Sequence, residues 1–271
     1  MKIIKNIKNL KETIVNISNL GFVPTMGGLH KGHLELIRKS INRSQKTLVS
    51  IYVNPTQFNK KKDFSKYPRN TKKDLQILKR QKVDFVFLPR TEEIYKSKIR
   101  KNIKIHRKKN VLCGKFRKGH FEGVIDVIDR FLSLINPKYI FLGEKDFQQL
   151  FLIKNYVRNK FKVKVVSCKT VRDKNYVALS SRNFLLSKKN LTTAGKIAKK
   201  LKSFKNRLQN NQNFKKNIND IKNKLIEKYN IKLEYLELRN EKDLSVFKKK
   251  NNKFRLFVAY YINKVRLIDN F

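Results

Sequence analysis

Two histidines three residues apart follow a glycine pair in the segment GFVPTMGGLHKGH. Its apolar start predicts a strand, and Gly27 and Gly28 permit a tight turn with close approach of the backbone to a ligand. A helix that begins after the turn would offer N–H groups and the positive end of its dipole to an anion. His30 and His33 are then able to face one way and to give hydrogen bonds or protons to phosphate oxygens. The segment predicts a nucleotide site, although a strand–turn–helix with two surface histidines has the same pattern.

Two further polar segments carry side chains that suit small anions or hydroxyl groups. In YVNPTQF, a proline stops the preceding strand, and the amides of Asn54 and Gln57 are able to bind a hydroxyl or a carboxylate. In FRKGHFEGV, Arg117 and His120 precede a predicted helix N-terminus, which suits an anion. A polar turn and a helix-capping loop explain these two patterns equally well.

Phosphate-binding chemistry is also indicated by the segments FLGEKDFQQ and ALSSRN. In the first, Gly143 permits close approach of a ligand and Lys145 is a compact cation. Asp146 is able to accept a hydrogen bond from a ribose hydroxyl or to orient the lysine. In the second, two serine hydroxyls and Arg182 are able to grip a pair of phosphates. The alternatives are a solvated charged turn and a surface loop.

Apolar runs alternate with helical periodicity over residues 1–170. Short runs bounded by proline, glycine or polar residues predict the strands Gly21–Pro24, Leu48–Val53, Asp84–Leu88, Tyr139–Leu142 and Val163–Ser167. Apolar residues at helical spacing between them predict the helices His33–Asn42, Thr71–Gln81, Glu122–Ile135 and Phe147–Arg158. Strands alternating with helices imply a parallel sheet covered on both faces. Three of the polar segments then meet at the carboxyl ends of strands, where such sheets bind ligands.

The sequence changes character near residue 170. It becomes lysine-rich with helical spacing over Lys188–Tyr229, and strand-like runs follow at Lys232–Leu238, Phe254–Tyr261 and Val265–Ile268, the last after a turn at Asn263–Lys264. We therefore expect an α/β protein in which residues 1–170 form a Rossmann-like domain, with a parallel sheet and helices on both faces. Residues 171–271 are expected to form a smaller α+β domain.

The net charge of +46, from 66 basic against 20 acidic residues, is a pattern that ordinarily suggests a nucleic-acid partner. The basic residues are spread along the whole chain and are mostly lysine, accompanied by asparagine and isoleucine, as AT-rich codon usage produces. We therefore expect no specific nucleic-acid partner. No apolar run approaches the ~20 residues of a membrane span, and Cys113 and Cys168 lack metal or redox spacing. A cytoplasmic protein with reduced, partly buried cysteines and no membrane partner is expected.

Together the motifs resemble those of the pantoate–β-alanine ligase (pantothenate synthetase) family. The matching segments, in the family's order and spacing, are PTMGGLHKGH, VNPTQF, DFSKYPR, GHFEGV, NPKYIFLGEKDFQQL, ALSSRN, YLELR and RLIDN. They cover the chain from about residue 20 to its end. The first and last catalytic motifs are also similar to the HIGH and KMSKS signatures of class I aminoacyl-tRNA synthetase-like nucleotidyltransferases.

The resemblance implies a two-step, Mg²⁺-dependent reaction in which pantoate is adenylated by ATP and β-alanine then displaces AMP to give pantothenate, a coenzyme A precursor. It implies that His33 is the proton donor to phosphate and that His30 is its partner. Gln57 would hold pantoate and β-alanine, and Gln149 pantoate. Arg117 and His120 are further candidates for the pantoate side. ATP contacts are implied for Met26, Gly27, Gly28, Leu29, His30, Lys31, Gly32, His33, Gly143, Glu144, Lys145, Asp146, Val171, Leu179, Ser180, Ser181 and Arg182.

The resemblance also implies a homodimer and a C-terminal domain that acts as a lid. It implies that Mg²⁺ is needed together with the substrate ATP and that the enzyme has no organic prosthetic group. Lys118 and Lys169 stand where many members have proline, so we expect less rigid loops there. Lys73 precedes Asp74 in a stretch that is often more acidic in relatives. We therefore expect phosphate oxygens and water to hold most of the metal's coordination sphere.

Two other function classes stay open at this point. A nucleic-acid-binding protein would use the positive charge, and its affinity would have to survive moderate salt. A nucleotidyltransferase with the same fold would act on another acid or on a phosphorylated alcohol. Gln57 and Gln149 argue against the second class, because a phosphorylated acceptor would more naturally be bound by arginine.

Overall fold

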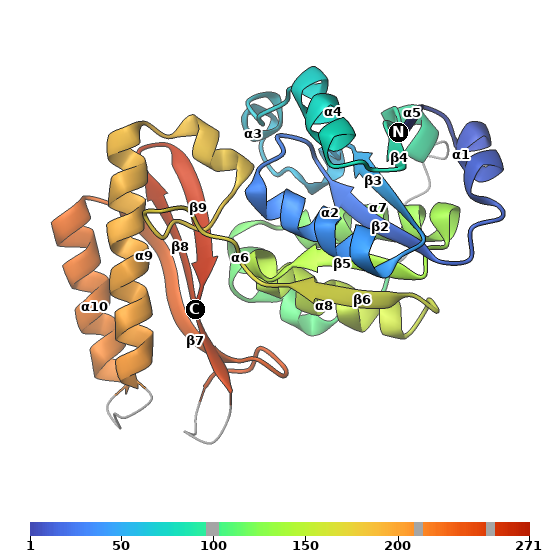
Figure 1. Ribbon diagram of the computed structural model, residues 1–271. Helices are drawn as coiled ribbons and strands as arrows, with labels where there is room; N and C mark the ends of the chain where they lie inside the picture. The colour runs from blue at the N-terminus through green and yellow to red at the C-terminus, as the bar shows by residue number, and fades with distance from the viewer. Residues whose placement is uncertain (96–102, 209–213, 248–252) are drawn as a thin grey trace.

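The computed structural model describes residues 1–95, 103–208, 214–247 and 253–271 (Figure 1). A parallel sheet with helices on both faces occupies one side of the molecule. A smaller antiparallel sheet, flanked by the long helices α9 and α10, lies beside it. The change from the first sheet to the second follows β6, the last parallel strand, which ends at Cys168. The predicted fold class is confirmed, and the predicted division into residues 1–170 and 171–271 stays a prediction.

The first sheet has the strand order β1-β4-β3-β2-β5-β6, and every pairing in it is parallel. Its strands are β1 (Lys2–Ile4), β2 (Leu20–Thr25), β3 (Lys46–Ile51), β4 (Phe85–Phe87), β5 (Tyr139–Gly143) and β6 (Lys164–Cys168). Successive strands after β2 extend the sheet in one direction through β4, whereas β5 returns to the other side of β2. The carboxyl ends of β2 and β5 therefore frame the switch point at which such sheets bind ligands.

The helices of this part are short except where they cover the sheet. They are α1 (Ile7–Ile14), α2 (Lys31–Arg43), α3 (Lys61–Ser65), α4 (Thr71–Arg80), α5 (Thr91–Ile94), α6 (Cys113–Phe116), α7 (His120–Ile135) and α8 (Phe147–Arg158), with 3₁₀ turns η1 (Pro55–Gln57), η2 (Arg107–Asn110), η3 (Glu144–Asp146) and η4 (Ser181–Leu185). Helix α7 is the most apolar of them. Its Phe131 ring packs edge-on against Phe22, with ring centroids 5.6 Å apart, and against Tyr52 at 6.1 Å. This packing fixes α7 on the sheet and so fixes the loop that precedes it.

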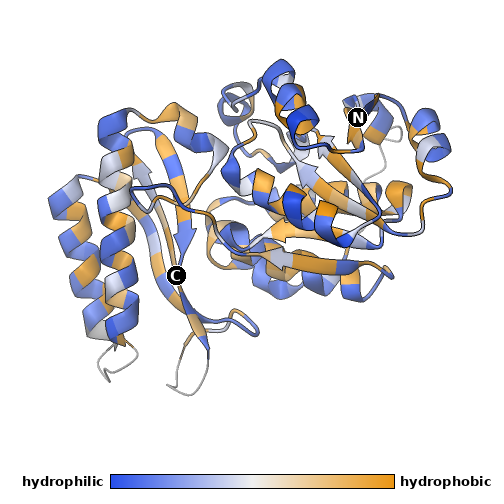
Figure 2. Cartoon of the chain, in the orientation of Figure 1, coloured by the Kyte–Doolittle hydropathy of each residue, from blue (hydrophilic) through white to orange (hydrophobic). Residues whose placement is uncertain are grey.

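The second sheet is antiparallel and consists of β7 (Lys232–Asn240), β8 (Phe254–Ile262) and β9 (Val265–Asn270). The helices beside it are α9 (Lys188–Leu208) and α10 (Phe214–Tyr229), which the sequence indicated as one helical stretch; residues 209–213 of that stretch lie outside the described residues. Figure 2 shows apolar and polar residues alternating along α9 and α10. Ile197 and Leu201 of α9 are fully buried, so the apolar side of this helix covers the sheet while its lysines meet solvent.

The two sheets share core contacts as well as polar contacts. Tyr235 and Phe257 of the second sheet pack into the hydrophobic cluster that is centred on α7 and α8. Across the same junction, the Arg172 guanidinium donates to both oxygens of Asp269, at 2.7 and 2.8 Å. The side-chain amide of Asn270 donates to the carbonyl oxygens of Glu144 and Lys145, each at 2.9 Å. The last strand therefore helps to hold the loop that follows β5.

Candidate active site

A cleft opens at the carboxyl ends of β2 and β5, beside the N-terminus of α2; we call it the main cleft. Most of the side chains that the sequence singled out line it. They are Met26, His30, Gly32, His33, Gln57, Gly143, Lys145, Asp146, Gln149, Val171, Leu179, Ser180 and Ser181. Asn54, Tyr67, Lys169 and Thr170 also contribute to its wall. Segments from distant parts of the chain thus meet at the sheet's switch point.

His30 and His33 cap the N-terminus of α2 with their ring nitrogens. Nδ1 of His30 accepts a hydrogen bond from the N–H of Gly32 at 3.1 Å, and Nδ1 of His33 accepts one from the N–H of His30 at 3.3 Å. The two ring centroids are 4.0 Å apart, so the side chains lie against each other. We expected the N–H groups at this helix end to be free for a ligand. That expectation is partly wrong, because the histidine rings accept hydrogen bonds from two of them.

This capping fixes the tautomer of both rings. Since each Nδ1 accepts, the hydrogen of the neutral ring is on Nε2, which is left to donate to a ligand. Burial, the neighbouring His33 and Lys145 together lower the pKa of His30 to about 3. Burial and Lys145 lower the pKa of His33 to about 4. Without a ligand, both side chains are therefore neutral hydrogen-bond donors at neutral pH.

The glycine turn before α2 is held by a carboxylate from α4. Asp74 accepts hydrogen bonds from the N–H groups of Gly28, at 2.9 Å, and Leu29, at 2.8 Å, and its own exposure is 2%. Gly27 and Gly28 have φ of 75° and 60°, a left-handed backbone that residues other than glycine rarely adopt. Asp74 is thus a structural acceptor for the turn, a role that the sequence did not indicate.

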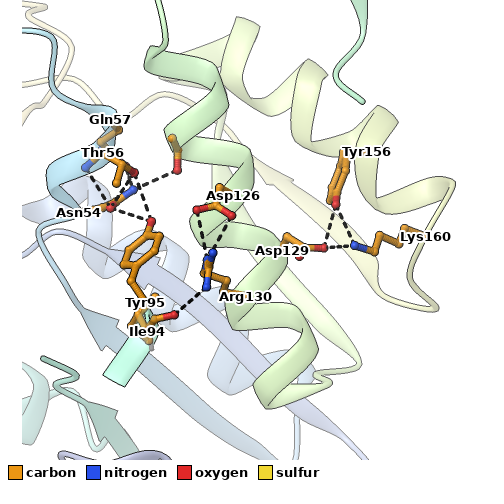
Figure 3. A network of polar contacts seen from close by, with 11 residues as sticks. Asn54, Thr56, Gln57, Ile94, Tyr95, Asp126, Asp129, Arg130, Tyr156 and Lys160 are labelled. Carbon is orange, nitrogen blue, oxygen red and sulfur yellow. Dashed lines mark hydrogen bonds and ion pairs between the residues drawn. The ribbon is translucent and has the colours of Figure 1, made fainter. Parts of the chain in front are cut away.

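Gln57 is held in place by the buried amide of Asn54 (Figure 3). The Asn54 Nδ2 donates to the carbonyl oxygen of Gly123 at 3.0 Å and lies 3.4 Å from Gln57 Oε1. Its Oδ1 accepts from the Tyr95 hydroxyl at 3.0 Å. Gln57 Nε2 in turn donates to the sulfur of Met26 at 2.8 Å. The amide of Gln57 therefore has a defined orientation at the cleft wall.

A close approach between α7 and the turn η1 reinforces this placement. A Cβ atom added at Gly123 would lie 2.5 Å from the Thr56 carbonyl oxygen and 2.7 Å from the Gln57 backbone nitrogen. Only glycine allows the helix and the turn to come this close. Within the motif GHFEGV, this glycine is required by packing rather than by chemistry.

His120 lies beneath the same turn and ties it to Arg117. Its Nδ1 lies 2.8 Å from the Gln57 carbonyl oxygen, and its Nε2 lies 2.9 Å from Nη1 of Arg117. Because a guanidinium is only a donor, Nε2 is the acceptor and Nδ1 carries the hydrogen that reaches Gln57. Burial and the adjacent Arg117 lower the pKa of His120 to about 3. His120 lines the pocket that adjoins the main cleft, and we refer to it together with His30 and His33 as the cleft histidines.

The two neighbouring glutamines of the sequence have different surroundings. Gln148 is buried, where its Oε1 accepts from the N–H of Cys113 at 3.1 Å and its Nε2 donates to the Val111 carbonyl at 2.6 Å. Gln149 lines the main cleft instead. Gln148 thus anchors the start of α8 to the chain before α6, whereas Gln149 faces the cleft.

Lys145 and Asp146 lie together across the cleft from the histidines. The ammonium of Lys145 donates to Asp146 Oδ1 at 3.1 Å. Burial alone would raise the pKa of Asp146, but Lys145 and then His120 and Arg117 favour the charged form, so the pKa is lowered. This cation and carboxylate pair is suited to bind a phosphate and a hydroxyl respectively.

The segment ALSSRN forms part of the cleft wall beside the glycine turn. The hydroxyl of Ser181 donates to the Gly28 carbonyl at 2.9 Å, and Ser180 Oγ accepts from the N–H of Arg182 at 3.2 Å. The Arg182 guanidinium donates to both oxygens of Asp63, at 2.7 and 2.8 Å. Burial opposes the charge on both, yet this pairing raises the pKa of Arg182 and lowers that of Asp63. Arg182 faces an adjoining pocket rather than the main cleft.

Some of the expected ATP-contact residues do not line the main cleft. These residues are Gly27, Gly28, Leu29, Lys31, Glu144 and Arg182, the last of which lines the adjoining pocket. The first three form the turn that Asp74 holds, Lys31 is an exposed residue of α2, and Glu144 pairs with Arg255 at 3.1 Å. Their assignment as ligand contacts stays a prediction.

No group of three or more histidine, cysteine or acidic side chains with metal-binding geometry occurs among the described residues. Cys113 and Cys168 are free thiols, and both are buried rather than partly buried as we had expected. None of the helices in the described ranges combines the length and the apolar character that a membrane span requires.

The adjoining pocket lies between the two sheets. The residues that it shares with the main cleft are Met26, Gln57, Tyr67, Lys145, Asp146, Gln149 and Ser180. Its further walls come from the start of α7 and from the second sheet, including Arg117 and Arg266. The two pockets therefore share a wall that includes Gln57. This is the arrangement that a two-substrate reaction needs.

Comparisons with known proteins give one answer. Residues 2–271 match the family model described as Pantoate-beta-alanine ligase. The pantothenate synthetase of Clostridium botulinum (strain Langeland) is 38% identical over 278 residues, which cover 100% of this chain and 99% of that protein. The pantothenate synthetase of Leptospira biflexa is 38% identical over 280 residues, with coverages of 100% and 98%.

Solved structures agree with the sequence comparison. Pantothenate synthetase from Thermus thermophilus superposes with a TM-score of 0.91 at 29% identity, covering 100% of this chain and 99% of that one. Pantoate-β-alanine ligase from Francisella tularensis, complexed with Beta-gamma ATP and β-alanine, has a TM-score of 0.84 at 36% identity, with coverages of 100% and 97%. The chain therefore belongs to the pantoate–β-alanine ligase family, and it is an ATP-dependent ligase that joins pantoate to β-alanine.

Proposed function

We propose that the main cleft carries out the first half of this ligation, the adenylation of pantoate by ATP, and that β-alanine enters through the adjoining pocket. The observation that carries this proposal is the convergence of His30, His33 and Lys145 on the same cleft as Gln57 and Gln149. The first three residues suit phosphate, and the two amides suit the hydroxyl and carboxylate groups of a small acid. A relative from Francisella tularensis is complexed with Beta-gamma ATP and β-alanine, which supports a site for each of these two substrates in this chain.

In the first step, a carboxylate oxygen of pantoate attacks the α-phosphorus of ATP. A new oxygen–phosphorus bond forms, the bond from the α-phosphorus to the bridging oxygen breaks, and pyrophosphate leaves. Negative charge therefore grows on the phosphate oxygens, where preorganised donors lower the barrier. We assign this stabilisation to the Nε2–H groups of His30 and His33 and to the ammonium of Lys145.

The protonation state of His33 decides how it acts. With a pKa of about 4 in the absence of ligand, His33 is neutral and donates a hydrogen bond rather than a proton. A bound triphosphate would bring negative charge to the ring and raise that pKa. His33 then becomes able to donate a proton to the leaving pyrophosphate, which is the role that the family resemblance implies for it.

In the second step, the amine of β-alanine attacks the acyl carbon of pantoyl adenylate. The ammonium group first loses a proton, a carbon–nitrogen bond forms, and the bond from the acyl carbon to the AMP oxygen breaks. AMP leaves with that oxygen, and the nitrogen gives up a further proton. Gln57, which lines both the main cleft and the adjoining pocket, is placed to contact pantoate and the amine substrate.

We propose that Mg²⁺ enters with ATP as part of the substrate. Two carboxylates contact the glycine turn or the segment ALSSRN and are already used: Asp74 accepts from two N–H groups, and Asp63 is paired with Arg182. In the described part of the chain, neither belongs to a cluster of metal-binding side chains. The ion would therefore be held mainly by phosphate oxygens and water.

The family resemblance further leads us to propose a cytoplasmic homodimer in which the smaller C-terminal part acts as a lid. Sedimentation equilibrium of the purified chain tests the dimer, and a single species with the mass of one chain would contradict it.

Pyrophosphate release tests the proposed first step. The purified protein should release pyrophosphate with ATP, pantoate and Mg²⁺ in the absence of β-alanine, and β-alanine should be needed only for turnover. His33→Ala should lower this rate by about 10²- to 10⁴-fold, because one positioned donor is lost. His106→Ala removes an exposed histidine outside both pockets and serves as the matched control. Unchanged pyrophosphate release in His33→Ala would remove the role assigned to His33.

A further inference from the structure

Three guanidinium groups line the adjoining pocket: Arg117, Arg182 and Arg266. Two of them are neutralised by carboxylates. Arg182 binds Asp63 through two hydrogen bonds, and Arg266 donates to Glu234 from Nε at 2.9 Å and from Nη2 at 2.6 Å. These two arginines therefore have their counter-charge within the protein.

Arg117 differs from them because its partners are neutral. Its Nη1 donates to Nε2 of His120 at 2.9 Å, and its Nη2 donates to the Gln57 carbonyl oxygen at 3.4 Å. Among the residues that the structure describes, no carboxylate lies within ion-pair distance of it. A guanidinium has five N–H donors, so three of them remain for a ligand.

The surroundings of Arg117 disfavour an unpaired charge. Burial and the nearby Arg266 and Arg182 lower the pKa of Arg117, and this effect exceeds the opposing influence of Cys113 and of the more distant Asp63. A partly buried cation next to other cations is stabilised when an anion binds to it. The His120 ring and the Gln57 carbonyl fix the direction of the guanidinium, so the site is formed before the anion arrives.

We infer that Arg117 binds the carboxylate of the amine substrate, β-alanine, in the adjoining pocket; this inference rests on the proposed function. The pantoate carboxylate loses its charge when it becomes the acyl adenylate, and pyrophosphate belongs to the histidine side of the main cleft. The carboxylate of β-alanine keeps its charge through both steps. It is therefore the one anion for which a permanent cation beside Gln57 remains useful throughout the reaction.

The geometry also gives Arg117 a specificity role. It donates to the backbone carbonyl of Gln57, one of the residues that line both the main cleft and the adjoining pocket. A substrate with its carboxylate at Arg117 would thus have its amine directed toward the Gln57 side of the pocket. Amines without a carboxylate would leave the guanidinium unpaired and would be poorer substrates.

The test compares two amines in the complete enzyme, β-alanine and n-propylamine, which lacks the carboxylate. Arg117→Gln removes the charge and keeps hydrogen-bonding groups, and Arg117→Lys keeps the charge without the fork. Lys115→Gln removes the same charge from an exposed residue of α6 and is the matched control. The readouts are kcat/KM for each amine and the rate of pantoate-dependent pyrophosphate release without amine.

We expect Arg117→Gln to lower kcat/KM for β-alanine by about 10- to 100-fold, the usual effect of losing a charge-assisted contact. The value for n-propylamine and the rate of pyrophosphate release should change by less than about threefold, and Arg117→Lys should restore part of the preference for β-alanine. Propionate should inhibit competitively against β-alanine in the wild-type enzyme and much less in Arg117→Gln.

Equal losses for both amines would assign Arg117 a merely structural role and overturn the inference. A loss of pyrophosphate release in Arg117→Gln, with an unchanged preference between amines, would place Arg117 in adenylation and would also overturn it. If Arg117→Gln does not fold, Arg117→Met, which also removes the charge, takes its place, and an unaltered amine preference in that variant contradicts the inference. If the wild-type enzyme itself releases no pyrophosphate, the proposed function fails, whereas the amine comparison concerns Arg117 alone.

Discussion

Replacing Asp74 by asparagine should destabilise the whole protein through the glycine turn. Asp74 is 2% exposed, and its two oxygens accept separate hydrogen bonds, from Gly28 at 2.9 Å and from Leu29 at 2.8 Å. Asparagine has one acceptor oxygen, so its NH₂ group would face one of these N–H donors and leave that donor unpaired. A buried hydrogen bond to a charged group contributes about 1.5–3 kcal/mol, and an unpaired buried donor costs a similar amount.

We therefore expect the Asp74→Asn variant to lose about 2–4 kcal/mol of the free energy of unfolding, and its Tm to fall by about 5–10 °C. Equilibrium urea denaturation followed by circular dichroism measures the change. The KM for ATP should rise in the same variant, because the turn places the histidines. Asp243→Asn makes the same chemical change at an exposed turn and is the control. A loss in Asp74→Asn no larger than that of an ordinary surface substitution, about 0.5 kcal/mol, would refute the assigned role.

Three other predictions follow from the same contacts. Gly123→Ala should lower the free energy of unfolding by about 1–3 kcal/mol and raise the KM for pantoate, because the new Cβ would lie 2.5 Å from the Thr56 carbonyl oxygen. An unchanged urea midpoint and an unchanged KM would contradict this prediction. The pKa values of the cleft histidines in the folded protein lie below 6.5, so the unfolded chain binds protons that the folded chain excludes as the pH falls. The free energy of unfolding should therefore fall by about 2 kcal/mol per histidine between pH 7 and pH 5. A urea midpoint that stays constant over this range would disprove the prediction. Asn270→Ala should raise the KM for ATP severalfold in steady-state assays, because two hydrogen bonds to the loop of Lys145 are lost, and a normal KM would argue against that support.

The fold could be predicted because the apolar pattern is strong where the elements are long. Helix α8 begins and ends at the predicted residues, Phe147 and Arg158, since its apolar positions repeat at helical spacing between a polar turn and a polar end. Strand β1 escaped prediction. It has only three residues, Lys2–Ile4, at the sheet edge, and a basic start with two isoleucines does not differ from a loop or a helix.

The site was predictable where a motif combines residue types that share one chemistry. The histidine–glycine segment and the two amides Gln57 and Gln149 meet in the cleft as expected. The support for these residues was not predictable. Asp74 accepts from N–H groups of a segment that is distant in the sequence, and Arg182 and Asp63 are likewise distant in the sequence and meet only in the folded chain. Such contacts depend on how distant segments pack together, so the local spacing of residues does not predict them.

The neighbouring glutamines show the limit most clearly. Gln148 and Gln149 are adjacent and chemically identical, yet their surroundings differ. The side-chain amide of Gln148 is hydrogen-bonded to backbone groups near α6, whereas Gln149 faces the cleft. The direction of each side chain follows from where α8 begins and how it packs, a matter of one residue in register. From the residues alone, either glutamine would have been an equally good ligand for pantoate.

Isotope transfer from pantoate to AMP tests the central claim most directly. Pantoate labelled with ¹⁸O in its carboxylate is incubated with ATP, Mg²⁺, β-alanine and the enzyme, and AMP is analysed by mass spectrometry. If the carboxylate oxygen attacks the α-phosphorus and leaves with AMP when the amine attacks, each AMP should carry one ¹⁸O atom. Unlabelled AMP, or formation of ADP in its place, would contradict adenylation in this cleft.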